Sequence, residues 1–140
     1  METIIVGAND SPTAAKALER AAVLAGALDA RLVVVTAYGD DEVDVIGVGS
    51  DTFIVGTAQQ ADDFATQAAA RLRAAHGVDA EGVAVQGKPD AAILDQARAC
   101  DATLIVVGNV RMQGVGRLLG SVANDIAHHA PCDVYIVKTT

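Results

Sequence analysis

A loop rich in glycine is the part of the chain best suited to bind a ligand. Its glycines and its closing serine are Gly108, Gly114, Gly116, Gly120 and Ser121. Glycine lets a backbone approach a ligand closely, and the first N–H groups of a helix that begins at Ser121 would attract an anion. Arg111 and Arg117 add positive charge. The pattern favours an anion-binding loop, with a plain strand-to-helix connection and a glycine–serine cap as the alternative.

Two other glycine patterns do not form nucleotide-binding motifs. Residues 82–88 match G-x-x-x-x-G-K, but Pro89 stands where a P-loop needs Ser or Thr, and the residues between the glycines are mostly apolar. Residues 114–120 read G-x-G-x-x-x-G, which is one residue longer than the dinucleotide fingerprint and lies far from the first strand. Neither a P-loop enzyme nor a hydride-transferring Rossmann enzyme is therefore expected.

The chain shows no convincing catalytic or metal-binding pattern. His128, His129 and Cys132 lie close in sequence, but a proline breaks the expected helix before the cysteine, and metal sites usually need three or four ligands. The acidic residues at 40–44 are typical of a solvated loop. Ser121 lacks the G-x-S-x-G context of a nucleophilic serine, and no histidine is placed as its base. We expect no catalytic residues and no metal site.

Short apolar runs alternate with alanine-rich segments of helical periodicity. The expected strands are residues 3–8, 31–37, 81–86, 102–107 and 133–137. The expected helices are residues 14–28, 58–75, 91–99 and 121–130. This alternation predicts an α/β protein, with a five-stranded parallel sheet and helices on both faces. Such sheets bind ligands beyond the carboxyl ends of their strands, so the loops at 9–11 and 108–121 are expected to meet there.

Two connections carry specific predictions. Ser11 is expected to cap the first helix, with Pro12 in its first turn. Residues 39–56 are acidic and contain glycines, without a clean period. We expect a long surface loop there, with a short strand or turn at residues 43–48.

Composition excludes several classes of protein. Of the 140 residues 51% are apolar and 3% aromatic, and the formal net charge is −8. The apolar content is sufficient for one core, whereas the acidic surplus argues against binding nucleic acid or an anionic membrane surface. No apolar run is long enough to cross a bilayer and no secretory signal is seen. Cys100 and Cys132 are expected to be buried free thiols, which indicates a cytoplasmic protein.

Residues 108–122 resemble the signature of the universal stress protein family. ATP-binding members of that family carry G-x2-G-x9-G-S/T between the fourth strand and the last helix. Residues 4–11 (IIVGANDS) are similar to the family's opening strand, and residues 129–137 (HAPCDVYIV) to its closing corner. The resemblance spans residues 1–140 as a single domain, weakest over 39–80. It implies a three-layer α/β sandwich with four helices and sheet order 3-2-1-4-5.

The chain departs from the family pattern at several positions. Arg111 stands at the second glycine of the motif, and eight residues rather than nine separate it from Gly120. Asn9 replaces the usual acidic residue after the first strand, and Asp10 replaces the usual glycine. The matching positions are Gly108, Gly120 and Ser121. The family contains ATP binders, non-binders and actinobacterial members that prefer cyclic AMP, and these departures leave all three open.

The resemblance also implies where a nucleotide would lie. Adenine would contact the backbone near Ala37, the ribose would lie by Asn9, and the phosphates would lie over the glycine-rich loop. The candidate nucleotide-binding residues are Ala8, Asn9, Ser11, Ala37, Gly108, Arg111, Gly114, Gly120, Ser121 and Val122.

We therefore expect a stress-response regulator that senses ATP, AMP or cyclic AMP, with Mg²⁺ accompanying ATP and slow ATP hydrolysis at most. The alternative is a dimeric interaction module with a vestigial pocket. The shortened loop and Arg111 favour a nucleotide with few phosphates. In the family the last strands of two protomers pair, and an unpaired apolar edge is a liability. A homodimer is expected, with Val134 and Ile136 near its two-fold axis.

Overall fold

The computed structural model describes residues 1–39, 44–48, 51–109 and 120–139, and for 44–48 and 51–55 it describes the backbone. Its strands are β1 (Thr3–Gly7), β2 (Arg31–Tyr38), β3 (Asp44–Val48), β4 (Asp51–Val55), β5 (Ala80–Gln86), β6 (Leu104–Gly108) and β7 (Asp133–Val137). Its helices are α1 (Ala14–Leu28), α2 (Ala58–His76), α3 (Pro89–Ala99) and α4 (Ser121–His129).

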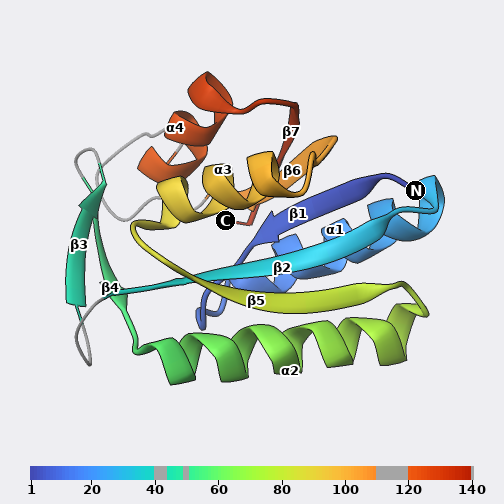
Figure 1. Ribbon diagram of the computed structural model, residues 1–140, viewed down its shortest axis with the longest axis horizontal. Coiled ribbons are helices and arrows are strands. Elements are labelled where there is room, and N and C mark those ends of the chain that lie inside the picture. Colours follow the sequence, from blue (N-terminus) through green and yellow to red (C-terminus); the bar gives the residue numbers. More distant parts are fainter. Residues whose placement is uncertain (40–43, 49–50, 110–119, 140) are drawn as a thin grey trace.

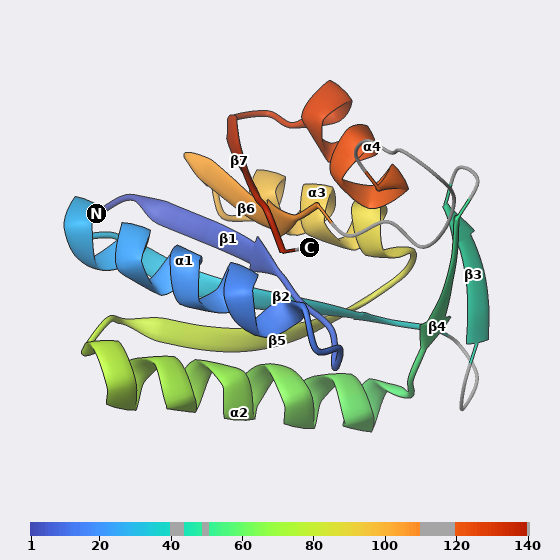
Figure 2. The ribbon, with the colours of Figure 1, turned by 180° about the vertical axis from the view of Figure 1, so that it is seen from behind.

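Five strands form one parallel sheet in the order β5-β2-β1-β6-β7, which confirms the expected order 3-2-1-4-5. β1 is central, and its Ile5 lies opposite Val33 of β2 and Ile105 of β6. Figures 1 and 2 show α1 and α2 on one face of the sheet and α3 and α4 on the other. The chain runs from β1 outward to β2 and β5, then crosses to β6 on the other side of β1. After β1 the chain continues toward β2, and after β6 it continues in the opposite direction toward β7. Folds of this kind bind ligands at the point between the two strands where the direction reverses.

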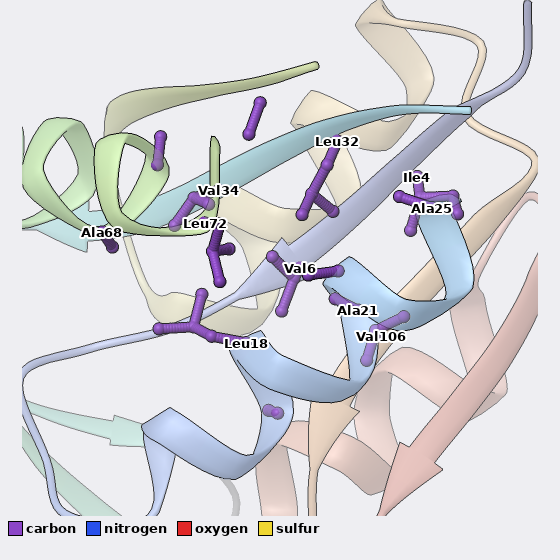
Figure 3. Packing of buried hydrophobic residues seen from close by; sticks show 14 of the residues in the cluster. Ile4, Val6, Leu18, Ala21, Ala25, Leu32, Val34, Ala68, Leu72 and Val106 are labelled. Carbon is purple, nitrogen blue, oxygen red and sulfur yellow. The ribbon is translucent and has the colours of Figure 1, made fainter. Parts of the chain in front are cut away.

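Alternate residues of the central strand pack into two separate cores, because successive strand residues point to opposite faces. Ile4 and Val6 face α1 and α2, whereas Ile5 faces α3 and α4. In the first core the helices contribute mainly alanines, together with Leu18 and Leu72 (Figure 3). Small side chains let the helices approach the sheet closely, so a core with few aromatic residues is still densely packed.

The approach of α2 to the sheet is tightest at Gly82 of β5. A Cβ atom on Gly82 would lie 2.7 Å from the backbone N of Thr66, and closer still to the carbonyl of Ala65. Both neighbours are backbone atoms of α2, which no side-chain rotation can move. Glycine at this position therefore lets α2 rest directly on the backbone of β5.

Two sequence-based predictions about connections need correction. The short strand expected at residues 43–48 is present as β3, but the rest of the expected loop at 39–56 is wrong, because a second strand, β4, pairs antiparallel with β3 in a hairpin; residues 40–43 and 49–50 lie outside the described residues. Its glycines and acidic residues obscured a strand pattern. Ser11 does not cap α1 and Pro12 is not in its first turn, because the helix begins at Ala14 with Thr13 as its N-cap. The carbonyl of Ser11 instead accepts a bond from the backbone N of Ala14 at 3.2 Å in a turn that precedes the helix. The bounds of α1 and β7 are as expected, and those of the other predicted elements shift by at most two residues.

β7 forms one edge of the sheet, with β6 as its neighbour in the described part of the chain. Tyr135 on β7 is 39% exposed, and Val134 and Ile136 are half-buried. An exposed strand edge is open to pairing with another chain. The homodimer through β7 stays a prediction.

The cysteines and the helices bear on two further expectations. Cys100 and Cys132 are free thiols, as expected, but they are half-buried rather than buried. Among the helices of the described residues, none has the length and apolar character needed to cross a membrane.

Candidate functional site

A pocket of about 600 Å³ opens at the carboxyl ends of β1, β2 and β6. Because each helix of this fold begins where a strand ends, α1, α2, α3 and α4 all contribute residues from their first turns to its wall. Cavities that hold small ligands usually measure about 300–1,000 Å³. This pocket therefore has the size and the place in the fold of a ligand site.

Most of the sequence-predicted site residues meet in this pocket. The predicted residues that line it are Ala8, Asn9, Ser11, Ala37, Gly108 and Val122. Gly120 and Ser121 directly precede Val122 at the start of α4. Arg111 and Gly114 lie outside the described residues. The turn after β1, the end of β6 and the start of α4 thus come together around the end of β2, and the role of these residues in binding stays a prediction.

The turn after β1 presents an exposed amide side chain to the pocket. The backbone N of Ala8 donates to the carbonyl of Val35 at 3.0 Å, which continues the β1–β2 ladder. The backbone N of Ser11 donates to the carbonyl of Asn9 at 2.9 Å and closes the turn. The Asn9 amide can both donate and accept hydrogen bonds, whereas a carboxylate would only accept. This wall is suited to a hydroxyl-bearing, uncharged part of a ligand.

The start of α4 forms the end of the pocket that is best suited to an anion. Gly120 is its N-cap, with extended backbone (φ −68°, ψ 162°) and no side-chain cap bond. The first N–H groups of a helix lack intrahelical acceptors and carry the positive end of its dipole. Val122 in the first turn lines the pocket, so a phosphate placed here would meet the favourable end of α4.

Sequence reasoning missed the wall formed by α2. Its lining side chains include Gln60, Asp63, Phe64 and Gln67, which recur at helical spacing along one side of α2. A capping box fixes this helix start: Thr57 Oγ1 accepts from Gln60 N at 3.1 Å, and Thr57 N donates to Gln60 Oε1 at 2.9 Å. The T-x-x-Q pattern before an alanine-rich run is the signal that would have placed these residues at the carboxyl edge of the sheet.

The charged side chains on the described pocket wall are acidic. Asp10 and Asp63 line it, whereas its described lining contains no lysine, arginine or histidine. Asp10 is exposed to solvent on the turn after β1, and Asp63 accepts a bond from Gln59 at 2.8 Å. Across the described residues, no three His, Cys, Asp or Glu side chains gather closely enough to hold a metal ion.

An acidic pair lies between α3 and α4 beside the pocket. Asp90 follows the lining residue Pro89, and its carboxyl group shares a hydrogen bond with Asp125 of α4. Burial raises the pKa of Asp90, and both the hydrogen bond and the charge of Asp125 raise it further. Backbone N–H groups at the start of α3 oppose this shift in part. The surroundings of Asp90 therefore disfavour its charged form.

A sequence profile of the universal stress protein family matches residues 1–138. The chain belongs to the universal stress protein family. It is 33% identical over 143 residues to a universal stress protein of Mycobacterium tuberculosis, covering 99% of this chain and 97% of that protein. It is 34% identical over 139 residues to one from Thermus aquaticus, with 98% of both chains covered.

Solved universal stress protein structures share the fold. One, crystallised in complex with cAMP, is 33% identical and gives a TM-score of 0.77 over 99% of this chain and 98% of that chain. Another, from Archaeoglobus fulgidus in complex with dAMP, is 23% identical with a TM-score of 0.73, covering 99% and 98% of the two chains. Within this universal stress protein fold, Gly108 stands at the end of β6 and Gly120 caps α4, so both described glycines of the motif flank the same pocket.

Proposed function

We propose that this protein binds an adenine nucleotide with few phosphates, cyclic AMP or AMP, in the pocket at the carboxyl ends of β1, β2 and β6, and that it acts as a stress-response regulator. The observation that carries the proposal is the pocket itself, with a helix start suited to a phosphate at one end and, on the α2 wall, Phe64 with the neutral amides of Gln60 and Gln67. A relative with 33% identity and the same fold was crystallised with cAMP.

The pocket wall favours one orientation of such a nucleotide. The phosphate belongs at Gly108 and the start of α4, where the dipole is favourable. The base belongs near Ala37 and Phe64, because Phe64 is an aromatic residue of the lining, half-buried against the first core, and the α2 wall offers neutral amides. The ribose then lies between them, within reach of Asn9.

The charges on the wall favour few phosphates over three. Each added phosphate group brings more negative charge into a pocket whose charged lining residues, among those described, are Asp10 and Asp63, both acidic. Cyclic AMP carries the least negative charge of the three candidates, and ATP carries the most. We therefore expect cyclic AMP or AMP to bind at least as tightly as ATP, with or without Mg²⁺.

Titration calorimetry with cyclic AMP, AMP, ATP and cyclic GMP tests the proposal. Asn9→Ala should weaken adenine-nucleotide binding about fivefold, since a hydrogen bond contributes about 1 kcal/mol. The matched control is Asn124→Ala, which alters an exposed side chain of α4 and should leave the affinity unchanged. Native mass spectrometry of the purified protein would detect a retained nucleotide. Absence of binding by all four nucleotides would refute the proposal, and clearly tighter ATP binding would refute the phosphate preference.

Arg111 adds a second test of the same pocket. If its guanidinium holds a phosphate, Arg111→Gly should weaken binding of cyclic AMP or AMP about tenfold, because charge-assisted contacts contribute about 1.5–3 kcal/mol. If its side chain instead fills the pocket, the same variant should gain affinity, most of all for ATP. The two cases therefore predict opposite changes in the nucleotide affinity of Arg111→Gly.

The open edge of β7 favours a second candidate function, an interaction module that pairs with a second copy of the chain. Tyr135 is exposed there, and Val134 and Ile136 are half-buried. Sedimentation at micromolar concentration measures this directly. A dimer without nucleotide binding would favour the interaction module, whereas a monomer would exclude pairing through β7.

A further inference from the structure

After β7, Thr139 is hydrogen-bonded to the residue that follows the neighbouring strand β6. This residue is only 4% exposed. Its backbone N–H donates to Oδ1 of Asn109 at 2.8 Å, and its hydroxyl donates to the same oxygen at 3.1 Å. The backbone N of Asn109 in turn donates to the carbonyl of Val137 at 2.9 Å. Two hydrogen bonds from Thr139 and one to Val137, the last residue of β7, thus join this end of the chain to the first residue after β6.

Thr139 also lies directly behind the pocket wall. A Cβ atom on Gly108, which lines the pocket, would lie 3.2 Å from Cγ2 of Thr139. On the other side, Nζ of Lys16 donates to the carbonyl of Thr139 at 3.5 Å. Lys16 belongs to the turn of α1 whose Ala14 and Ala17 line the same pocket. Thr139 therefore fills the corner between the end of β6 and the start of α1.

We propose that Thr139 and Asn109 form a positioning pair that fixes where Gly108 stands in the pocket wall and so sets the affinity for the ligand. The inference rests on the proposed nucleotide binding. Thr139 is a positioning residue, since it acts through Gly108 and is not part of the pocket lining. Binding groups must be held within about 0.5 Å of their productive places, and a pair of bonds on one amide oxygen of the half-buried Asn109 supplies that restraint.

Two substitutions of Thr139 test its hydroxyl and its methyl group one at a time. Thr139→Val keeps the shape and removes the hydroxyl, whereas Thr139→Ser keeps the hydroxyl and removes the methyl. We expect Thr139→Val to bind cyclic AMP and AMP about fivefold more weakly, and Thr139→Ser to stay within about twofold of wild type. Lys138→Ala is the control, because Lys138 is the exposed neighbour of Thr139.

Gly108→Ala gives an independent measurement of the same contact. The added methyl would press on Cγ2 of Thr139, an atom that Thr139→Ser lacks. We expect Gly108→Ala alone to weaken binding, and the double variant Gly108→Ala/Thr139→Ser to recover most of the loss. A double variant that binds as weakly as Gly108→Ala would mean that the new methyl obstructs the ligand directly, and that result overturns the positioning pair.

The outcomes separate this inference from the function on which it rests. If wild type binds no adenine nucleotide, the proposed function fails and the positioning pair fails with it. If wild type binds and Thr139→Val binds equally well, the positioning pair alone is refuted. Circular dichroism melting checks the fold of each variant, and should Thr139→Val not fold, the Gly108→Ala pair of titrations decides.

Discussion

Replacing Gly82 by alanine should destabilise the protein, whereas the same replacement at Gly26 should stabilise it. At Gly82 the new Cβ would lie 2.7 Å from the backbone N of Thr66, where ordinary contacts begin at 3.4 Å. To restore an ordinary contact, α2 must retreat by at least 0.7 Å, the difference between these distances. At Gly26 in α1 the nearest neighbour is Cγ1 of Val78 at 3.8 Å, which is an ordinary contact.

The size of each effect follows from these distances. Overpacking a core typically costs about 1–3 kcal/mol, and retreat of α2 also loosens the buried alanines that it packs on β2 and β5. We expect Gly82→Ala to lose about 3 kcal/mol of unfolding free energy. Gly26→Ala removes a flexible residue from a helix and should gain about 0.5–1 kcal/mol.

Urea unfolding followed by far-UV circular dichroism measures both changes, since the chain contains no tryptophan. With a urea m-value of about 1–3 kcal/mol/M, Gly82→Ala should lower the midpoint by about 1–3 M. Gly26→Ala should raise it slightly. A Gly82→Ala variant within about 0.5 kcal/mol of wild type would refute the backbone contact between α2 and β5, as would equal losses at the two positions.

Three further predictions concern pH, helix capping and the base. The pKa of Asp90 is raised above its ordinary value of 3.8, so its contribution to stability is present below that value and is lost as pH rises through the raised pKa. The amide of Asp90→Asn can donate to Asp125 and does not titrate. This variant should therefore not lose that stability in urea titrations from pH 3 to 7. Thr57→Val breaks the capping box and should cost about 1 kcal/mol of unfolding free energy, whereas Thr66→Val on the exposed side of α2 should cost much less. Phe64→Leu keeps an apolar side chain but loses the aromatic face, so adenine-nucleotide affinity should fall about tenfold in calorimetry; unchanged affinity would place the base elsewhere.

The sheet and most of the pocket could be predicted because their signals are local. The run at 31–37 is apolar and β-branched over one strand length, and the glycines at 108 and 120 bracket a connection between a strand and a helix. The strand order came from the family resemblance and is confirmed.

The missed features depend on contacts between distant parts of the chain. The T-x-x-Q pattern marks where α2 begins, but that Phe64 lines the pocket also depends on the packing of α2 against the sheet, as at Gly82. Asn109 and Thr139 are 30 residues apart in sequence, and nothing local pairs them. Ser11 is not the N-cap because it lies in a turn before the helix, and Thr13 is the residue at the N-cap position.

The position of the chain's two ends affects how the protein should be labelled. Met1 is 82% exposed and lies at the amino end of the central strand β1 (Figure 2), whereas Thr139, which follows β7, is 4% exposed. If Thr139 positions Gly108 as proposed, an affinity tag or fluorophore joined just after Thr139 would disturb the pocket wall and alter the affinity that it was added to measure. Tags therefore belong at Met1, and a dye placed deliberately after Thr139 should report pocket occupancy.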